Sequence, residues 1–130
     1  MITKHDIPNV YSLIGKTSIQ EVLSIIKNSV LFVGLDSGLM HIAVSLNIPT
    51  FTIWGPSDFN LYGYEKINSD KHEIIYKNIY CRPCNSWIAP NTKRISKPED
   101  CPDFRCMKEL KPDEVFNRFN IFARLYISEV

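Results

Sequence analysis

The alternation of apolar and helical segments between positions 10 and 54 constrains the fold of this chain more than any other feature. Short apolar runs at 10–14, 30–35 and 49–54 are separated by two segments, 18–28 and 38–46, whose apolar residues recur at helical spacing. The run at 30–35 is apolar throughout, which is typical of a parallel strand covered on both faces. Strands that alternate with helices form βαβ units with right-handed crossovers. We therefore predict an α/β protein with a small parallel sheet.

Local signals set the ends of several of these elements. Ser18 and Glu21 have the S-x-x-E spacing of a capping box, which predicts a helix start. Pro49 ends the second helix, because the residue before proline is disfavoured in the helical region. A weaker fourth strand is expected at 73–76, and Pro112 suits the first turn of a last helix. The expected apolar stripe of that helix is Val115, Phe116, Phe119, Phe122 and Tyr126.

The segment between the strand-rich region and the last helix reads as a loop. Residues 81–111 contain four prolines, show no apolar periodicity and hold all four cysteines of the chain. The chain therefore divides into a βαβ core at 1–80, a Cys/Pro-rich loop at 81–111 and a C-terminal helix at 112–130. At 130 residues these parts make one structural domain. The basic residues of the loop, Arg82 among them, are expected to be solvated.

The charge balance and the apolar runs exclude several classes of protein. Lys and Arg number 15 against 14 Asp and Glu, whereas a nucleic-acid binder carries a clear basic excess. No apolar run approaches the roughly 20 residues of a membrane span. The N-terminal residues have no apolar stretch of signal-peptide length. We therefore expect no nucleic-acid partner and no membrane-spanning segment.

The segment Asp36–His41 is the strongest candidate for a binding site. It follows the apolar run at 30–35 and opens a helix, and ligands of open parallel sheets bind beyond the carboxyl ends of the strands. A helix start offers free amides to a phosphate, Gly38 permits close approach, and Asp36 can accept hydrogen bonds from sugar hydroxyls. His41 lies one turn into the helix and could reach the same crevice. The alternative is that Asp36 or Ser37 is an ordinary N-cap and His41 a satisfied, partly buried histidine.

Two further loops are expected beside this segment. Gly55–Asp58 follows the run at 49–54, and Gly15–Ser18 follows the run at 10–14. Because Gly55–Asp58 and the segment Asp36–His41 follow successive strands and would lie at the same edge of the sheet, a crevice is more plausible than isolated turns, which remain the alternative. The chain lacks the spacing of a P-loop and any Gly-rich dinucleotide fingerprint. NAD and FAD binding are therefore unsupported.

Taken together, four segments of the chain resemble glycosyltransferase family 9, the ADP-heptose:lipopolysaccharide heptosyltransferases and their relatives. They are 13–21, 32–43, 48–50 and 54–58, with a D-[ST]-G-x-M-H-x-A run from Asp36, a P-T pair at 49–50 and a G-P-[ST]-D run from Gly55. The resemblance covers roughly residues 10–116. It implies half of a GT-B fold: a Rossmann-like, three-layer domain that corresponds to the C-terminal, donor-binding domain.

The resemblance also implies roles for individual residues. Asp36 would contact the donor sugar, and the backbone amides of Ser37 and Gly38 would hold the diphosphate. His41 would line the donor site. Lys16 and Thr17 fall where the family approaches the nucleotide base.

The activity implied is inverting transfer of a heptose or related sugar from ADP-heptose to the lipopolysaccharide core. This chemistry needs no metal cofactor, and it takes place in the cytoplasm, with peripheral association at the inner face of the inner membrane. The family's catalytic base and acceptor site belong to its N-terminal domain. We therefore expect no catalytic residue in this chain and no sugar transfer by the chain alone.

The four cysteines admit three interpretations. Cys81 and Cys84 form a C-x₂-C pair, and Cys101 and Cys106 form a C-x₄-C pair sixteen residues further on. These pairs could hold a structural zinc ion, pack as reduced thiols, or form disulfides, which a cytoplasmic location disfavours. A zinc site would also fit a competing hypothesis, a non-catalytic interaction module. A nucleotide-binding module on the same scaffold is a further alternative.

Overall fold

The computed structural model describes residues 8–84 and 101–127, and in them three parallel strands form one sheet. The strands are β1 (Phe32–Leu35), β2 (Thr50–Trp54) and β3 (His72–Tyr76), and they lie in the order β1-β2-β3. Much of the predicted Cys/Pro-rich loop, at 85–100, lies outside the described residues, as do 1–7 and 128–130. The sheet is small and parallel, as the sequence predicts.

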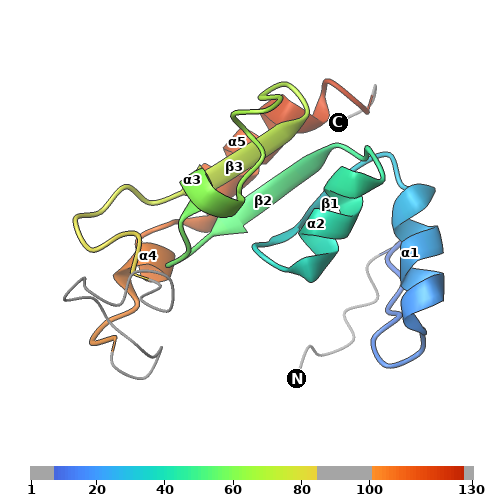
Figure 1. Ribbon diagram of the computed structural model, residues 1–130, viewed down its shortest axis with the longest axis horizontal. Helices are drawn as coiled ribbons and strands as arrows, with labels where there is room; N and C mark the ends of the chain where they lie inside the picture. Colours follow the sequence, from blue (N-terminus) through green and yellow to red (C-terminus); the bar gives the residue numbers. More distant parts are fainter. Residues whose placement is uncertain (1–7, 85–100, 128–130) are drawn as a thin grey trace.

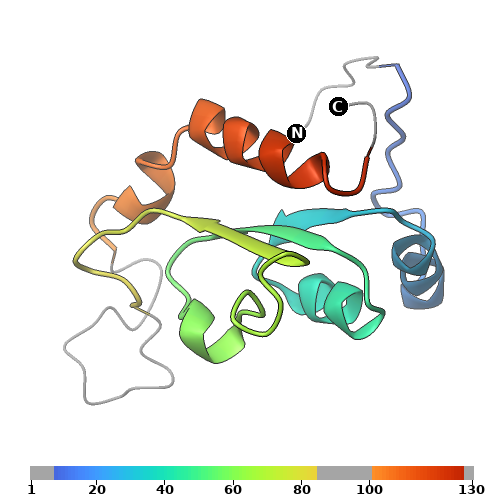
Figure 2. The ribbon, with the colours of Figure 1, turned by 90° about the horizontal axis from the view of Figure 1, so that it is seen from above.

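Helices cover the sheet on both faces (Figures 1 and 2). On one face lie α2 (Gly38–Ser45) and α3 (Phe59–Tyr62), and α1 (Ile19–Lys27) packs beside α2 at the β1 edge. On the other face α5 (Pro112–Ala123) packs against β2 and β3, and a short helix, α4 (Arg105–Lys108), precedes it. This helix–sheet–helix arrangement confirms the expected Rossmann-like, three-layer α/β architecture.

Each face of the sheet has its own apolar core. On the α2 side Met40, Trp54 and Ile74 are buried together. On the α5 side Phe51 and Ile75 pack with residues of the C-terminal segment. Because Phe51 and Trp54 are fully buried and lie on opposite faces of β2, the central strand joins the two layers.

The predicted helix signals act as expected at two places. The Ser18 side chain accepts a hydrogen bond from the Glu21 amide, and the Glu21 carboxylate accepts one from the Ser18 amide at 2.7 Å. This reciprocal capping box starts α1, and Pro112 stands at the first residue of α5. Asn47 closes the turn after α2 in the left-handed region, with φ of 62°.

The predicted strand at 10–14 is wrong. Residues 10–14 form no strand, and the exposed fractions of Val10, Tyr11 and Ile14 are 65%, 83% and 77%. A strand needs a partner for its backbone hydrogen bonds, and no described strand pairs with this segment.

The expectation that 30–35 is covered on both faces is also wrong. On the α5 side Val33 and Leu35 are 52% and 56% exposed, and among the described residues β1 pairs only with β2. The covered half of the strand is the other face, where Phe32 packs against the core that contains Met40 and Trp54.

The C-terminal region differs from the prediction in three respects. The short helix α4 lies within the predicted loop, and α5 ends at Ala123 rather than continuing to 130. Phe116 is 62% exposed and so does not belong to the buried stripe, whereas Phe119 and Phe122 do pack inward. None of the helices in the described parts of the chain is long and apolar enough to cross a membrane.

Candidate functional site

The carboxyl ends of the three strands lie side by side, and the loops that follow them share one edge of the sheet. Leu35 pairs in register with Ile53, and Ile53 with Ile75. The Asp36–Ser37 bend after β1 therefore neighbours the Gly55–Asp58 loop after β2 (Figure 1). This confirms the expected placement of the two loops at the same edge.

The start of α2 carries no side-chain cap. Ser37 is the N-cap residue, but its side chain makes no capping hydrogen bond. At the other two helix starts on this face, Ser18 and Asp58 do accept such bonds, the Asp58 carboxylate from the Asn60 amide at 2.9 Å. The first amides of α2 are therefore available to an anion, and the ordinary-cap interpretation of Ser37 does not hold.

The space around this helix start is open. A Cβ added at Gly38 would meet no atom within 4 Å, whereas one at Gly34 would lie 2.7 Å from the Phe32 ring. Gly38 is therefore not required by the packing of the chain itself. Asp36 is half-buried in the bend before it, and among the described residues none donates a hydrogen bond to its carboxylate. Both features leave room for a ligand.

His41 contacts Tyr64. Its Nδ1 lies 2.9 Å from the Tyr64 hydroxyl, and the two rings meet edge to face with their centres 5.6 Å apart. His41 is thus a half-buried histidine with a partner, as the alternative interpretation expects. Within residues 8–84 and 101–127, its other ring nitrogen, Nε2, makes no hydrogen bond.

Lys16 and Thr17 lie in the turn that precedes α1. Gly15 takes a positive φ of 69°, and the Lys16 amide donates to the Leu13 carbonyl at 3.0 Å. Lys16 is exposed and Thr17 is half-buried. Figure 1 shows that α1 and α2 run in the same direction, so this turn lies at the same edge as the α2 start. Among the described residues, no hydrogen bond joins Lys16 or Thr17 to Asp36.

Arg82 holds the Gly55–Asp58 loop in place. Its Nε donates to the Gly55 carbonyl at 2.6 Å and its Nη2 to the Ser57 carbonyl at 3.1 Å. The guanidinium carbon lies 4.6 Å from the centre of the Tyr76 ring, a cation–π distance. The expectation of a solvated Arg82 is therefore wrong. No local sequence signal marks it, because both carbonyls lie 25 or more residues away.

The Arg82 guanidinium is half-buried among cysteine, tyrosine and aspartate side chains. Burial lowers the pKa of the Arg82 guanidinium, while Cys106, Tyr76, Asp58 and Cys84 partly offset that effect. The loop is held a second time, because the Cys84 amide donates to the Pro56 carbonyl at 2.9 Å. The cysteine-containing turn after β3 thus contacts the second loop of the candidate site.

The four cysteines are free thiols. Cys106 is buried, and the other three are half-buried. The pKa of the Cys84 thiol is raised. Burial is the largest cause, and the neighbouring Cys106, Cys81 and Cys101 add to it. Within residues 8–84 and 101–127, no three His, Cys, Asp or Glu side chains are already arranged as metal ligands.

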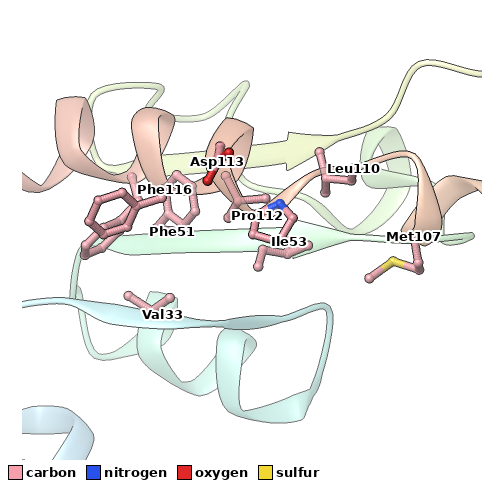
Figure 3. A pocket seen from close by; sticks show the side chains of 10 residues that line it. Val33, Phe51, Ile53, Met107, Leu110, Pro112, Asp113 and Phe116 are labelled. Carbon is pink, nitrogen blue, oxygen red and sulfur yellow. The ribbon is translucent and has the colours of Figure 1, made fainter. Parts of the chain in front are cut away.

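An apolar groove lies on the opposite face of the sheet (Figure 3). Its volume is about 600 Å³, and Val33, Ile53, Pro112 and Phe116 are among its lining residues. Asp113 is the one charged residue of its lining. Because the groove lies under α5 and offers few polar groups, it does not suit a diphosphate, and the candidate site remains the edge beside α2.

Comparisons with known proteins identify the family of the chain. The sequence model of glycosyltransferase family 9 (heptosyltransferase) matches residues 2–94. Lipooligosaccharide heptosyltransferase 2 of Campylobacter jejuni serotype O:6 is 30% identical over 114 residues, which is 88% of this chain and 32% of that protein. Lipopolysaccharide heptosyltransferase 3 of Escherichia coli K12 is 30% identical over 105 residues, 69% of this chain and 30% of that protein.

A third relative has a higher sequence identity to the chain over a shorter stretch. Lipooligosaccharide heptosyltransferase 2 of Haemophilus influenzae is 41% identical over 64 residues, 49% of this chain and 18% of that protein. The chain thus spans about a third or less of the length of these curated relatives. No solved structure matches the chain significantly.

Proposed function

Because the chain belongs to glycosyltransferase family 9, we propose that it forms the nucleotide-sugar-binding part of a heptosyltransferase that acts on the lipopolysaccharide or lipooligosaccharide core. The relatives, a lipooligosaccharide heptosyltransferase and a lipopolysaccharide heptosyltransferase, support this class of enzyme. The donor that we propose is ADP-heptose or a related nucleotide sugar. Such an enzyme works in the cytoplasm, at the inner face of the inner membrane, where its lipid-linked acceptor is presented.

The observation that carries the proposal is the uncapped start of α2 after β1. In the proposed complex the diphosphate lies against the amides of Ser37 and Gly38, where the positive end of the helix dipole favours negative charge. The Asp36 carboxylate accepts hydrogen bonds from sugar hydroxyls. The open space at Gly38 lets the diphosphate approach the backbone.

The remaining candidate residues take supporting roles. His41 borders the donor through Nε2 while Tyr64 holds Nδ1. Lys16 and Thr17, at the same edge, face the nucleotide base. The Gly55–Asp58 loop, held by Arg82, forms the other wall of the crevice.

The proposed reaction is inverting. An acceptor hydroxyl attacks the anomeric carbon of the heptose, and the bond from that carbon to the diphosphate oxygen breaks. The electron pair leaves with ADP, and a base takes the proton of the attacking hydroxyl. The amides at the start of α2 stabilise the charge that develops on the leaving diphosphate. This role needs no metal ion.

We assign no catalytic base within these 130 residues. From the family resemblance we expect the base and the acceptor site in a second Rossmann-like domain. We therefore expect the 130-residue polypeptide alone to bind the donor without transferring the sugar. Appearance of heptosylated acceptor in a turnover assay of this polypeptide would contradict that expectation.

Calorimetric titration with ADP tests the binding role. We expect ADP and ADP-heptose each to show saturable binding to the wild-type chain. Because Asp36 contacts the sugar in the proposed complex, Asp36→Ala should lose the binding of ADP-heptose. The matched control is Asp70→Ala. Asp70 is exposed and lies just before β3, at the amino ends of the strands, whereas the proposed site lies at their carboxyl ends. Binding that is equally weakened by both substitutions, or absent from the wild-type chain, would refute the proposed site.

A further inference from the structure

The two cysteine pairs are separated by sixteen residues in the sequence, but they lie near one another in the fold, since Cys84 is close enough to Cys81, Cys101 and Cys106 for their charges to act on it. The guanidinium carbon of Arg105 lies 5.8 Å from the centre of the Tyr80 ring. Arg105 precedes Cys106, and Tyr80 precedes Cys81, so this contact joins the flanks of the two pairs. Figures 1 and 2 both show the chain after β3 running beside α4.

A second contact joins the pairs through Gly55. Arg82, which stands between Cys81 and Cys84, donates to the Gly55 carbonyl at 2.6 Å. The sulfur of Met107, which follows Cys106, lies 3.0 Å from the position that a Cβ on Gly55 would occupy. Both cysteine segments therefore rest against the same loop after β2.

We propose that Cys81, Cys84, Cys101 and Cys106 bind one zinc ion, which cross-links the turn after β3 to α4 and fixes the Gly55–Asp58 loop. Four sulfur ligands form the closed tetrahedral set of a structural zinc site. Each thiol gives up its proton to solvent as its sulfur binds the metal. No electron is transferred, and the ion replaces only those protons.

The local backbone suits thiolate ligands. The Phe104 amide donates to the Cys101 sulfur at 3.3 Å, and the Met107 amide donates to the Phe104 carbonyl at 3.0 Å. Phe104 has a φ of 51°, a left-handed conformation that bulky residues rarely adopt. The chain is thus turned so that a backbone donor faces the Cys101 sulfur.

The charge of the proposed centre also has a partner. Four thiolates around one zinc ion leave two excess negative charges. Arg82 lies close enough to Cys106 and Cys84 for their charges to act on its guanidinium. Arg82 therefore contributes a compensating positive charge. Its hydrogen bonds to the Gly55 and Ser57 carbonyls connect the proposed metal centre to the loop after β2.

Metal binding requires the sulfur atoms to move closer together. Among the described residues, no three ligand-type side chains already have the arrangement of a metal site. The four thiols nevertheless share one neighbourhood, because Cys106, Cys81 and Cys101 all lie near enough to Cys84 to act on it electrostatically. Three of the thiols are only half-buried, so the ion has access from solvent.

Zinc analysis of the 130-residue chain tests the proposal. We expect about one equivalent of zinc in protein purified with a reductant and without a chelator. Cys84→Ser and Cys106→Ser should each lose most of this zinc. The matched control is Asp103→Asn, which removes a carboxylate between two of the cysteines and should retain the ion. Less than about half an equivalent in the wild type, or equal zinc in all variants, would overturn the proposal.

Cobalt substitution gives a readout that needs no variant to fold. Co²⁺ added to metal-free, reduced chain should produce the sulfur-to-metal charge-transfer and visible bands of tetrahedral thiolate coordination. A spectrum without thiolate charge transfer would contradict the proposal. So would a mass of the native protein lower by two hydrogens for each cysteine pair, because that loss identifies disulfides.

Hydrogen exchange tests the effect on the loop. Zinc added to the metal-free chain should slow exchange in peptides that cover residues 55–62, and it should leave peptides that cover α1 unchanged. Tight zinc binding with unchanged exchange at 55–62 would refute the coupling through Arg82. Because no nucleotide is used in these experiments, their outcome is independent of the proposed donor site.

Discussion

Replacing Gly38 with alanine separates the stability of the chain from its proposed ligand site. In the folded protein the added methyl group would meet no atom within 4 Å, and Gly38 does not need a left-handed backbone. The substitution therefore costs the fold nothing. It also restricts the unfolded chain, because alanine has fewer backbone conformations than glycine. The net result is a more stable folded state.

The expected gain in stability is small and measurable. A Gly→Ala change at a compatible position raises the free energy of unfolding by about 0.4–1 kcal/mol. With an unfolding entropy of about 2.1 cal/mol/K per residue, this corresponds to an increase of about 2–4 °C in the melting temperature of a chain of this size. Differential scanning calorimetry of the two proteins measures this shift.

The same methyl group should weaken ADP binding. It would stand where the diphosphate approaches the first amides of α2, and overpacking of a close contact costs about 1–3 kcal/mol. The dissociation constant for ADP would then rise about 5- to 150-fold, as measured by isothermal titration calorimetry. The control is Ser45→Ala, at the exposed last residue of α2, which should leave ADP affinity unchanged.

Two results would refute this reasoning in different places. If Gly38→Ala bound ADP as tightly as the wild type, the diphosphate would not lie against the amide of residue 38. If the variant melted at a lower temperature than the wild type, the space around Gly38 would not be open in solution. A more stable chain that binds ADP poorly is the combination that the structure predicts.

Three other perturbations have definite expected outcomes. Thr52→Val removes the acceptor of the Trp54 indole N–H, now at 2.9 Å, and should cost about 1–3 kcal/mol in urea unfolding. Arg82→Lys keeps the charge but loses the planar stacking and one carbonyl contact, so amides at 55–58 should exchange faster with solvent. Burial, and then a neighbouring lysine, lowers the pKa of His72. Below pH about 6.5, His72 therefore binds a proton in the unfolded chain but not in the folded chain, and the free energy of unfolding falls as the pH falls. His72→Gln should reduce the dependence of this free energy on pH, measured by unfolding from pH 7.5 to about 5.5.

Sequence reasoning succeeds here where a signal is local. The Ser18–Glu21 box and Pro112 fix helix starts through atoms a few residues apart, so the sequence alone identifies them. The position of Asp36–Gly38 between β1 and the start of α2 was predictable for the same reason, while the binding role of this segment stays a prediction. The β2 strand is equally clear from the sequence, since its five residues are all aromatic or β-branched.

The failures involve partners that are distant in the sequence. Residues 10–14 have a composition suited to a strand, but the pattern cannot say whether a neighbouring strand exists to pair with them. Arg82 lies in a polar segment, and only the fold brings the Gly55 carbonyl to it. Likewise Tyr64, the partner of His41, is 23 residues away. Neither contact has a local signature in the sequence.

The outer side of β1 has a consequence for handling the protein in solution. Among the described residues no strand pairs with that side, and Val33 and Leu35 beside it are more than half exposed. Such an edge is a template to which another extended chain can add backbone hydrogen bonds. Concentrated samples should therefore self-associate through β1, and a gatekeeper lysine introduced by Val33→Lys should oppose this aggregation without touching the α2 face.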